Sequence, residues 1–516
     1  MNRPGSLSEG SDGIEEAGLT EEDLPPEWMM AEGERGMEIE ELLKAVPGAA
    51  VSGTGKFRVA SLSADSRGVM PGSVFIAIKG FEADGHAYIG EAVKKGARAV
   101  VVNESWTGTV PGPAVMEIRV SDTRLAAARF AGLFSGHPSA RINLVGVTGT
   151  NGKTTTTYLL RSILKAAGRP VSLFGTIGYD LDGEEREATH TTPDAIELQA
   201  MLARIAGRKD AFAVMEVSSH ALELGRVEGC EFDLAVFTNL SQDHLDFHHS
   251  MEGYFQAKRR LFTELSRPRR KTGPVRAVIN TDDPWGARLA GDLDAPAWTF
   301  GLEDGTDLGV RDLESSLQGL RFFMTTPAGD VSVQTHLVGK HNVYNILGAA
   351  AAGLHFGIPL DTISEGIAAL KGVPGRFEKL ESDRGFSVIV DYAHTEAALE
   401  HLLQTVRELT PGKVITVFGC GGDRDPGKRA PMGRVAAYYS DRVVMTSDNP
   451  RTEDPAAIIS EIETGARVEA AGRENTVVLE SISDRKEAIG KAMAHARKGD
   501  CVVVAGKGHE DYQIIG

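Results

Sequence analysis

The stretch 145–157 reads Val-Gly-Val-Thr-Gly-Thr-Asn-Gly-Lys-Thr-Thr-Thr-Thr and combines the residue types that bind phosphate. Its apolar beginning predicts the end of a strand, and its threonines predict the start of a helix. Gly149 and Gly152 would let backbone N–H groups approach a phosphate chain, and Lys153 would supply a positive charge. The Thr154 hydroxyl would reach a magnesium ion at the start of the helix. We therefore predict a nucleoside triphosphate site; a plain strand-to-helix turn would not need the Lys-Thr pair.

Continuous apolar runs indicate that this strand belongs to a larger sheet. Strands are predicted over 142–148, 212–217, 234–239 and 277–280. Strands that are apolar throughout are typical of a parallel sheet covered by helices on both faces. Open sheets of this kind bind ligands at the carboxyl ends of their strands.

Polar residues follow two of these strands, in Glu216-Val-Ser-Ser-His220 and in Asn239-Leu-Ser-Gln-Asp-His-Leu-Asp-Phe-His248. Glu216 would lie level with Thr154, so its carboxylate could complete an oxygen-rich magnesium shell. His244, flanked by two aspartates, is a candidate ligand or acid/base. Taken alone, Glu216 or His244 would be an ordinary loop residue. Because both are expected at the same edge of a nucleotide-binding sheet, a catalytic role is favoured.

The segment after this sheet is expected to form a hairpin and a helix. Alternating residues over 320–338 predict antiparallel strands around Thr326-Pro-Ala-Gly329. The alanine-rich run that follows Gly339 predicts a core helix, with Asn342 as its N-terminal cap.

A second α/β unit is predicted from about Gly375 onward. Its strands are expected over 387–392, 414–420, 443–447 and 501–505, and its helices over 396–409, 430–439 and 485–497. This alternation is typical of a small Rossmann-like sheet. Polar stretches lie at the strand ends: Asp391-Tyr-Ala-His394, Gly419-Cys-Gly-Gly-Asp-Arg-Asp425, Asp448-Asn-Pro-Arg451 and Gly506-Lys-Gly-His-Glu-Asp511. The Gly-Cys-Gly-Gly turn is a weak candidate for a dinucleotide site, because no G-x-G-x-x-G opens a helix there.

The first residues are predicted to be disordered, and a compact domain follows them. Residues 1–36 contain ten acidic residues against Arg3 and Arg35, so they contribute −8 of the net charge of −17. From about Met37 a mixed α/β domain is expected. Its strands are predicted over 57–62, 74–78 and 99–102, its helix over 86–96, and a loop over 79–85.

Composition excludes several classes of protein. The 516 residues, 41% of them hydrophobic, suffice for roughly three or four domains. The net charge of −17 argues against a nonspecific nucleic-acid binder. Cys230, Cys420 and Cys501 are too few and too scattered for a disulfide framework or a zinc site, and fit a reducing cytoplasm. The sequence predicts neither export nor membrane insertion.

Taken together, the polar stretches resemble the Mur ligase family from about residue 38 to the last residue. The matching motifs occur in the family's order: Asp65-Ser-Arg67, Gly149–Thr155, Met215–His220, Asp243-His-Leu-Asp246, Asp391–Thr395, Gly421–Asp425, Asp448–Thr452 and Gly506–Tyr512. The resemblance implies an α/β fold of three domains behind the acidic tail of residues 1–36. These are a small N-terminal domain for a UDP-linked substrate (37–140), a central ATP-binding domain with a P-loop-type parallel sheet (141–372) and a C-terminal Rossmann-like amino-acid domain (373–516).

The same resemblance implies an ATP-dependent ligase of cytoplasmic peptidoglycan precursor synthesis. It would add meso-2,6-diaminopimelate to UDP-N-acetylmuramoyl-L-alanyl-D-glutamate. ATP would phosphorylate the free carboxylate of the dipeptide, and the incoming amine would attack the acyl phosphate. Lys153 and Mg²⁺ held by Thr154 and Glu216 would neutralise the transferred phosphoryl group. The implied ATP contacts are Gly149, Thr150, Asn151, Gly152, Lys153, Thr154, Thr155, Asn342 and Arg376.

Further roles follow only from the resemblance. His244 would help to hold a second magnesium ion, and Lys258 would be carbamylated, which turns a cationic amine into an anion. The residues expected to bind the UDP-muramoyl dipeptide are Ala64, Ser66, Ala83, Thr191, Thr192, Ser218 and Arg226.

The choice of amino acid would depend on the C-terminal unit. Diaminopimelate differs from lysine by a distal carboxylate, so its site needs a cation at that end. Arg451 can pair with a carboxylate through two hydrogen bonds, with Arg424 as a second guanidinium, while Glu510 would accept from an ammonium. The implied site comprises Arg424, Asp448, Asn449, Pro450, Arg451, Gly506 and Glu510. A solvated cluster of charges at the strand ends is the alternative.

The chain departs from the family pattern at several positions. Phe81-Glu82 replaces His-Gln, Leu224 replaces a glutamine, and Glu396 replaces a proline at a predicted helix start. Apart from the family pattern, Val147 stands where the usual P-loop pattern has its first glycine. The chain stops at Gly516, where the resemblance implies a further helix, so we expect a truncated end.

Two rival functions remain open. One is a different amide ligase on the same scaffold, for lysine or for folylpolyglutamate; Asp448–Arg451 argues against lysine and Asp65-Ser-Arg67 against folate. The other is a non-catalytic nucleotide-binding paralogue, which the intact lysines and Glu216 oppose. We expect a monomer that binds no nucleic acid.

Overall fold

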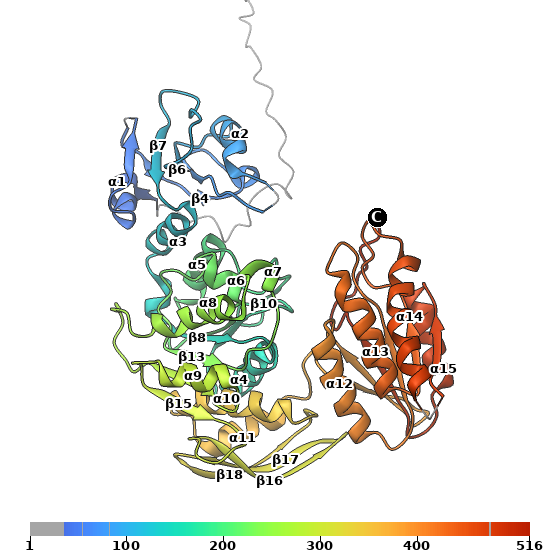
Figure 1. Ribbon diagram of the computed structural model, residues 1–516. Coiled ribbons are helices and arrows are strands. Elements are labelled where there is room, and N and C mark those ends of the chain that lie inside the picture. The colour runs from blue at the N-terminus through green and yellow to red at the C-terminus, as the bar shows by residue number, and fades with distance from the viewer. Residues whose placement is uncertain (1–35, 54, 82, 474–475) are drawn as a thin grey trace, which may run out of the picture. The chain divides into compact units, whose positions relative to one another are not determined.

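The structure is a computed structural model that describes residues 36–516 except 54, 82 and 474–475 (Figure 1). The predicted disordered tail therefore lies, apart from Gly36, outside the described residues. The described chain forms two compact units. The first comprises the residues up to Pro138 together with Ala195–Arg204 and Gly225–Gly229, and the second comprises the rest.

The first unit is built on a sheet of order β2-β7-β6-β5-β4, with a separate β1-β3 pair. Its strands are β1 (Met37–Glu38), β2 (Ala50–Ser52), β3 (Arg58–Val59), β4 (Leu62–Ser63), β5 (Val74–Ile76), β6 (Ala99–Asn103) and β7 (Met116–Val120), and its helices are α1 (Ile39–Leu42), α2 (Ile89–Lys94) and α3 (Thr123–Phe134). Asp122 caps α3 by accepting from the N–H groups of Arg124 and Leu125. The predicted α/β pattern is confirmed, although the predicted helix over 86–96 begins as a 3-10 turn and becomes α-helical only at Ile89.

The second unit contains the predicted parallel sheet, of order β11-β10-β9-β12-β8-β13-β14-β15. Its strands are β8 (Asn143–Thr148), β9 (Val171–Phe174), β10 (Tyr179–Asp180), β11 (Glu185–Arg186), β12 (Phe212–Glu216), β13 (Leu234–Phe237), β14 (Arg276–Asn280) and β15 (Ala297–Phe300). Strand β8 pairs in parallel with both β12 and β13, which places the ends of all three strands at one edge. In the described part of this sheet, β10 pairs antiparallel with both β9 and β11, and the other pairings are parallel.

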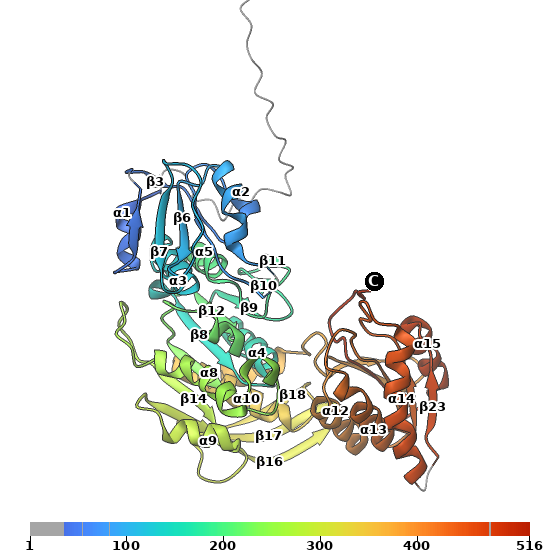
Figure 2. The same ribbon diagram turned by 45° about the horizontal axis from the view of Figure 1, so that its top comes forward.

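Helices cover both faces of this sheet, as the apolar strands predicted (Figure 2). They are α4 (Lys153–Ala166), α6 (Ser219–Glu223), α7 (Leu245–His248), α8 (Met251–Glu264), α9 (Pro284–Gly291), α10 (His341–His355) and α11 (Leu360–Ala369). Helix α5 (Ala195–Ile205) belongs to the first unit except for Ile205. Val145 and Val147 of β8 pack in one core with α4, α10 and α11. Gly146 faces the other way, where an added Cβ would lie 3.2 Å from Leu261 of α8. Helix α8 is thereby held close beneath the phosphate-binding turn.

The predicted hairpin is present as β17 (Gly319–Thr326) and β18 (Gly329–Thr335), which join β16 (Gly309–Ser316) in a small antiparallel sheet. Helix α10 follows, but the predicted cap is wrong. The N-cap position is Lys340, and Asn342 lies inside the first turn, where its Nδ2 donates to Val338 O at 2.8 Å. The side chain is 4% exposed, and it is used to bind the preceding loop.

The C-terminal part of the second unit has a sheet of order β19-β20-β24-β21-β22-β23. Its strands are β19 (Glu378–Glu381), β20 (Ser387–Asp391), β21 (Val414–Phe418), β22 (Arg442–Met445), β23 (Val478–Ser481) and β24 (Cys501–Ala505), and its helices are α12 (Glu396–Leu409), α13 (Arg429–Tyr439), α14 (Pro455–Gly472) and α15 (Arg485–His495). Strands β20 to β24 pair in parallel, and β19 adds an antiparallel edge. The Rossmann-like prediction is confirmed, including the helix start at Glu396, but α14 was not predicted.

Residues of α12, α13 and α14 share one core with the sheet, and Ala488 and Ala492 of α15 share another (Figure 1). Sheet residues that alternate along β21 divide between these two cores, so the helices cover opposite faces. Cys230, Cys420 and Cys501 are free and buried. Among the described residues, no helix is long and apolar enough to cross a membrane.

Candidate active site

The phosphate-binding turn depends on glycines that no other residue can replace. Gly149 has φ of +147° and Gly152 has φ of +86°, and Gly152 is the N-cap of α4. A Cβ on Gly149 would collide with Thr238 Oγ1 and come within 3.0 Å of Asn239 O, and a Cβ on Gly152 would collide with Asn345 Oδ1. The turn is therefore pressed against neighbouring segments, with its N–H groups at the start of a helix, where anions bind.

Two lysines donate to the same carbonyl of this turn. Lys153 Nζ lies 3.1 Å from Gly149 O and 2.9 Å from Thr150 O, and Lys258 Nζ of α8 lies 2.8 Å from Gly149 O. Lys258 is 1% exposed, and burial together with the nearby Lys153 lowers its pKa well below the usual value. Burial also lowers the pKa of Lys153, against the opposing effect of Glu216. Two lysine amines with lowered pKa values thus lie beside the turn where phosphates would bind.

The loop after β13 fixes the other side of the turn. Thr150 accepts from Ser241 N at 3.0 Å, and its hydroxyl lies 3.2 Å from Tyr254 OH. Asn151 donates its N–H to Asn239 Oδ1 at 3.0 Å. These contacts bring together the two stretches that the sequence placed at one edge of the sheet.

Glu216 ends strand β12 and is 1% exposed. Its Oε1 accepts from Thr176 N at 3.0 Å, and its Oε2 accepts from Thr176 Oγ1 at 3.2 Å. Thr154, 4% exposed, lies in the first turn of α4 and receives a long hydrogen bond of 3.4 Å from Arg376 Nη2. Buried oxygen donors with few partners fit Mg²⁺, which takes one or two carboxylates together with phosphate oxygens and water.

The loop 239–248 carries a cluster of aromatic and histidine rings. His244 has φ of +53°, and its ring centroid lies 4.8 Å from that of His220 and 6.1 Å from that of Tyr254. Burial lowers the pKa of His244, against Asp243, so the neutral imidazole is favoured. Burial lowers the pKa of His248 to about 4, and its Nε2 makes no hydrogen bond in the described structure. Neutral imidazoles are the form that binds metals.

No group of three or more His, Cys, Asp or Glu residues within the described chain is arranged to hold a metal by itself. The predicted metal residues Thr154, Glu216 and His244 therefore form no complete protein cage.

The residues predicted to bind the dipeptide fall into both compact units. In the second unit, Thr192 Oγ1 donates to Glu216 O at 2.8 Å and accepts from Ser218 N at 3.0 Å. Thr191 Oγ1 lies 3.1 Å from Thr176 Oγ1, the hydroxyl that also donates to Glu216. Arg226 belongs to the first unit, as do Ala64, Ser66 and Ala83.

The predicted uridine-side residues of the first unit differ in exposure. Ala64 and Ala83 are exposed, whereas Ser66 is 6% exposed and donates to Glu91 Oε2 at 3.0 Å. Phe81, one of the departures from the family pattern, is 75% exposed, and Glu82 lies outside the described residues.

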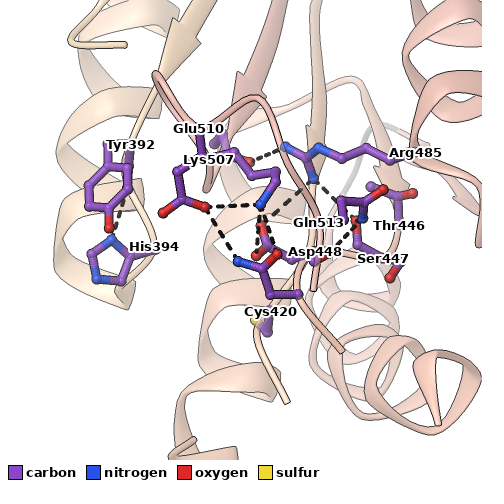
Figure 3. Close-up of polar contacts among 12 residues, drawn as sticks. Tyr392, His394, Cys420, Thr446, Ser447, Asp448, Arg485, Lys507, Glu510 and Gln513 are labelled. Atoms are coloured by element: carbon purple, nitrogen blue, oxygen red, sulfur yellow. Dashed lines mark hydrogen bonds and ion pairs between the residues drawn. The ribbon is translucent and has the colours of Figure 1, made fainter. Parts of the chain in front are cut away.

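The predicted amino-acid site forms a polar cluster at the ends of β22 and β24 (Figure 3). Lys507 Nζ donates to Asn449 Oδ1 at 3.0 Å and to Glu510 Oε2 at 2.9 Å. Asn449 Nδ2 in turn lies 3.3 Å from Glu510 Oε2. Asp448 lies between Lys507 and Arg485, with N···O distances of 4.0 and 3.9 Å. The segments 448–451 and 506–510 are therefore brought together as predicted.

The two arginines of this site are placed differently. Arg451 has φ of +51°, and its Nη1 donates to Gly422 O at 2.8 Å, which ties it to the glycine-rich turn after β21. Arg424 is exposed, so its guanidinium is available to a ligand. A Cβ on Gly506 would lie 3.0 Å from Asp448 Oδ2, so this glycine is required for the close approach of the two segments. Pro450 adjoins Arg451, and its carbonyl faces Gly422.

Several residues of these sites were not predicted. Thr176 binds Glu216, Lys507 and Arg485 flank Asp448, and buried Arg429 donates to Glu453 at 2.8 Å. Lys507 could have been predicted from the sequence, because it lies inside the motif Gly506–Asp511. Thr176 and Arg429 carry no local signal, because their partners are distant in sequence.

Comparison with known proteins agrees with this geometry. The chain matches the families described as "Mur ligase family, catalytic domain" over residues 58–135, "Mur ligase middle domain" over 147–353 and "Mur ligase, glutamate ligase domain" over 375–508. A relative from Geobacter metallireducens, named UDP-N-acetylmuramoyl-L-alanyl-D-glutamate–2,6-diaminopimelate ligase, is 46% identical over 494 residues, which cover 93% of this chain and 95% of that protein. A relative of the same name from Gloeobacter violaceus is 48% identical over 459 residues, covering 89% of this chain and 90% of the relative.

A solved structure carrying that name also matches, with a TM-score of 0.64 and 32% identity over 92% of this chain and 95% of the other. The sequence identity, the coverage and the phosphate-binding edge of the central sheet agree, and the chain belongs to the Mur ligase family.

Proposed function

We propose that the protein is an ATP-dependent ligase that joins meso-2,6-diaminopimelate to UDP-N-acetylmuramoyl-L-alanyl-D-glutamate in the synthesis of peptidoglycan precursors. The observation that carries the proposal is the meeting of Asp448–Arg451 with Gly506–Glu510 in a protein that also has a phosphate-binding turn. The relatives named for this reaction cover almost the whole chain, which supports the same assignment.

On the nucleotide side, the phosphates of ATP bind at Gly149–Thr155. Lys153 neutralises the transferred phosphoryl group, and Asn342 and Arg376 lie toward the rest of the nucleotide. Mg²⁺, held by Thr154 and Glu216 with His244 at a second position, supplies further charge neutralisation when bound. The dipeptide carboxylate attacks the γ-phosphorus, ADP leaves, and an acyl phosphate is formed.

Lys258 is proposed to be carbamylated. Its amine is buried, and its pKa is lowered by burial and by Lys153, so the neutral form that reacts with CO₂ is favoured. The amine nitrogen bonds to the carbon of CO₂ and loses a proton, which leaves an anionic carbamate. An anion at this position would attract the cations that gather around the phosphates.

On the substrate side, Ala64, Ser66 and Ala83 bind the uridine end, and Thr191, Thr192, Ser218 and Arg226 bind the muramoyl dipeptide. In the C-terminal part, Arg451 and Arg424 pair with carboxylates of diaminopimelate, and Glu510 accepts from an ammonium. Asp448, Asn449, Pro450 and Gly506 complete the amino-acid site. The amine attacks the acyl carbon, phosphate leaves, and an amide is formed.

The proposal includes the organisation of the protein. We assign residues 37–140 to the UDP-substrate domain, 141–372 to the ATP-binding domain and 373–516 to the amino-acid domain. The protein acts as a monomer in the cytoplasm, where ATP and UDP-linked precursors are present.

Phosphate release by the purified protein tests the proposal. The assay contains ATP, Mg²⁺ and UDP-N-acetylmuramoyl-L-alanyl-D-glutamate, with either meso-diaminopimelate or L-lysine. Release with diaminopimelate alone is expected. Release with L-lysine at a similar rate would overturn the choice of amino acid, and no release with either would leave a nucleotide-binding paralogue as the better explanation.

A further inference from the structure

Lys507 is a buried cation that lies in the amino-acid site without having been assigned a role there. It follows β24 in the turn Gly506–Asp511 and is 7% exposed. Its Nζ donates to Asn449 Oδ1 at 3.0 Å and to Glu510 Oε2 at 2.9 Å, and Figure 3 shows its side chain reaching toward Glu510. A buried ammonium needs such partners, because burial without them is costly.

The three side chains form a closed triangle. Asn449 donates from Nδ2 to the same Glu510 oxygen at 3.3 Å, and its Oδ1 also accepts from Ile514 N at 3.0 Å. Glu510 Oε2 therefore has two donors that come from different segments of the chain. A glutamate side chain has several rotatable bonds, and two donors on one oxygen restrict them.

Asp448 lies at a similar, longer distance from two cations. Arg485 Nη1 lies 3.9 Å from Asp448 Oδ2, and Arg485 is itself fixed by donating to Ala505 O at 2.9 Å. Lys507 is 4.0 Å from Asp448 Oδ1 but within hydrogen-bond distance of Glu510. Lys507 is therefore hydrogen-bonded to Glu510 and not to Asp448.

We propose that Lys507 is a positioning residue for the incoming amino acid, because it holds the Glu510 carboxylate and the Asn449 amide in the geometry that receives an ammonium group. The inference rests on the proposed function, in which both groups bind diaminopimelate. Lys507 acts through them and does not contact the reacting atoms. A preset carboxylate binds an ammonium without first losing conformational freedom.

Steady-state kinetics of Lys507→Met tests the inference. Methionine has a similar length but neither charge nor donor. We expect the KM for diaminopimelate to rise about tenfold or more, as for the loss of a hydrogen bond to a charged group. The KM for ATP should stay unchanged. The control is Lys491→Met, a half-exposed lysine of α15 that pairs with Glu480, and it should change neither KM.

A double-mutant cycle separates positioning from a general structural effect. Because Lys507 acts through Glu510, Lys507→Met should add little to the KM for diaminopimelate when Glu510→Gln is already present. An additive effect, or an equal rise in the KM for ATP, would overturn the inference. If Lys507→Met alone does not fold, the double variant, which leaves no unpaired charge between these two residues, is compared with Glu510→Gln in the same way.

Assays of the wild-type protein separate a failure of the proposed function from a failure of the role proposed for Lys507. Absence of diaminopimelate-dependent phosphate release from the wild type would overturn the proposed function. An active wild type together with a normal KM for diaminopimelate in Lys507→Met would overturn only the role of Lys507.

Discussion

Lys153 and Lys258 bring two amine nitrogens to the carbonyl of Gly149, and protonation of both is unfavourable in the absence of anions. Each lysine lowers the tendency of the other to carry a proton, and burial adds to this effect. The anionic groups that the proposed reaction brings, the phosphates and a carbamate, would relieve the repulsion. The residue-scale chemistry therefore depends on the charge of Lys258.

Lys258→Ala should lower kcat by about 100-fold or more, a loss of the size found when one stabilising group is removed from an active site. Short carboxylates such as acetate should restore part of the activity, because they can replace the carbamate anion. The measurement is phosphate release with and without added carboxylate. Lys165→Ala, an exposed lysine in the last turn of α4, is the control. Unimpaired activity of Lys258→Ala would contradict the carbamate.

Arg451→Ala should raise the KM for diaminopimelate about 10- to 100-fold, since charge-assisted bonds to a carboxylate are lost. The KM for ATP should not change, because the phosphate-binding turn lies in another sheet. The control is Arg467→Ala on α14, an exposed arginine paired with Glu463. Parallel increases in both KM values would argue against the assigned role of Arg451.

At the scale of the elements, helices α13 and α14 cross closely enough to require glycine on both. A Cβ on Gly433 of α13 would collide with Ile462 O, and a Cβ on Gly465 of α14 would collide with Ala430 O. In each case the added Cβ would meet a backbone carbonyl of the other helix, and a helix backbone cannot rotate away as a side chain can. Helix α14 begins shortly after Arg451, with Asp454 capping its start.

Gly465→Ala should lower the free energy of unfolding by about 1–3 kcal/mol, the usual cost of overpacking. Urea denaturation followed by circular dichroism measures the change. Gly490→Ala on α15 is the matched control, because a Cβ there would meet nothing within 4 Å. It should stabilise the protein by about 0.5–1 kcal/mol, since alanine favours helix. Equal effects of both substitutions would show that the crossing is less tight than described.

At the scale of the whole molecule, stability depends on pH through buried neutral groups such as His355 at the end of α10. Burial, reinforced by Arg276, lowers the pKa of His355 from 6.5 to about 4. At pH values between about 4 and 6.5, His355 is protonated in the unfolded chain but neutral in the folded protein. Stability is therefore complete above about pH 6.5 and is lost as the pH falls toward 4.

His355→Gln should remove part of this dependence. Between pH 7 and pH 5 the wild type should lose about 1–2 kcal/mol more of its free energy of unfolding than the variant does. Urea denaturation at the two pH values measures the difference. His336→Gln, at an exposed histidine, serves as the control and should follow the wild type. Identical pH dependence of wild type and His355→Gln would contradict the assignment.

The sequence by itself determined the elements and the chemistry that neighbouring residues produce. The turn Gly149–Thr154 was predictable because glycine, lysine and threonine act there at short range, and α12 was predicted with its observed bounds, Glu396–Leu409. The parallel sheets were predictable because strands buried on both faces must be apolar throughout. Helix α14 was not predicted, although Asp454 as N-cap followed by Pro455 is a local start signal for a helix.

Only the tertiary structure decided which distant groups meet. Lys258 reaches Gly149 O across 109 positions of sequence, and Lys507 reaches Asn449 across 58. The same packing made Asn342 a donor to Val338 O and excluded it as a helix cap. Residue type and local spacing fix what a side chain can do, but burial and the approach of separate strands fix its partners, and these depend on the whole fold.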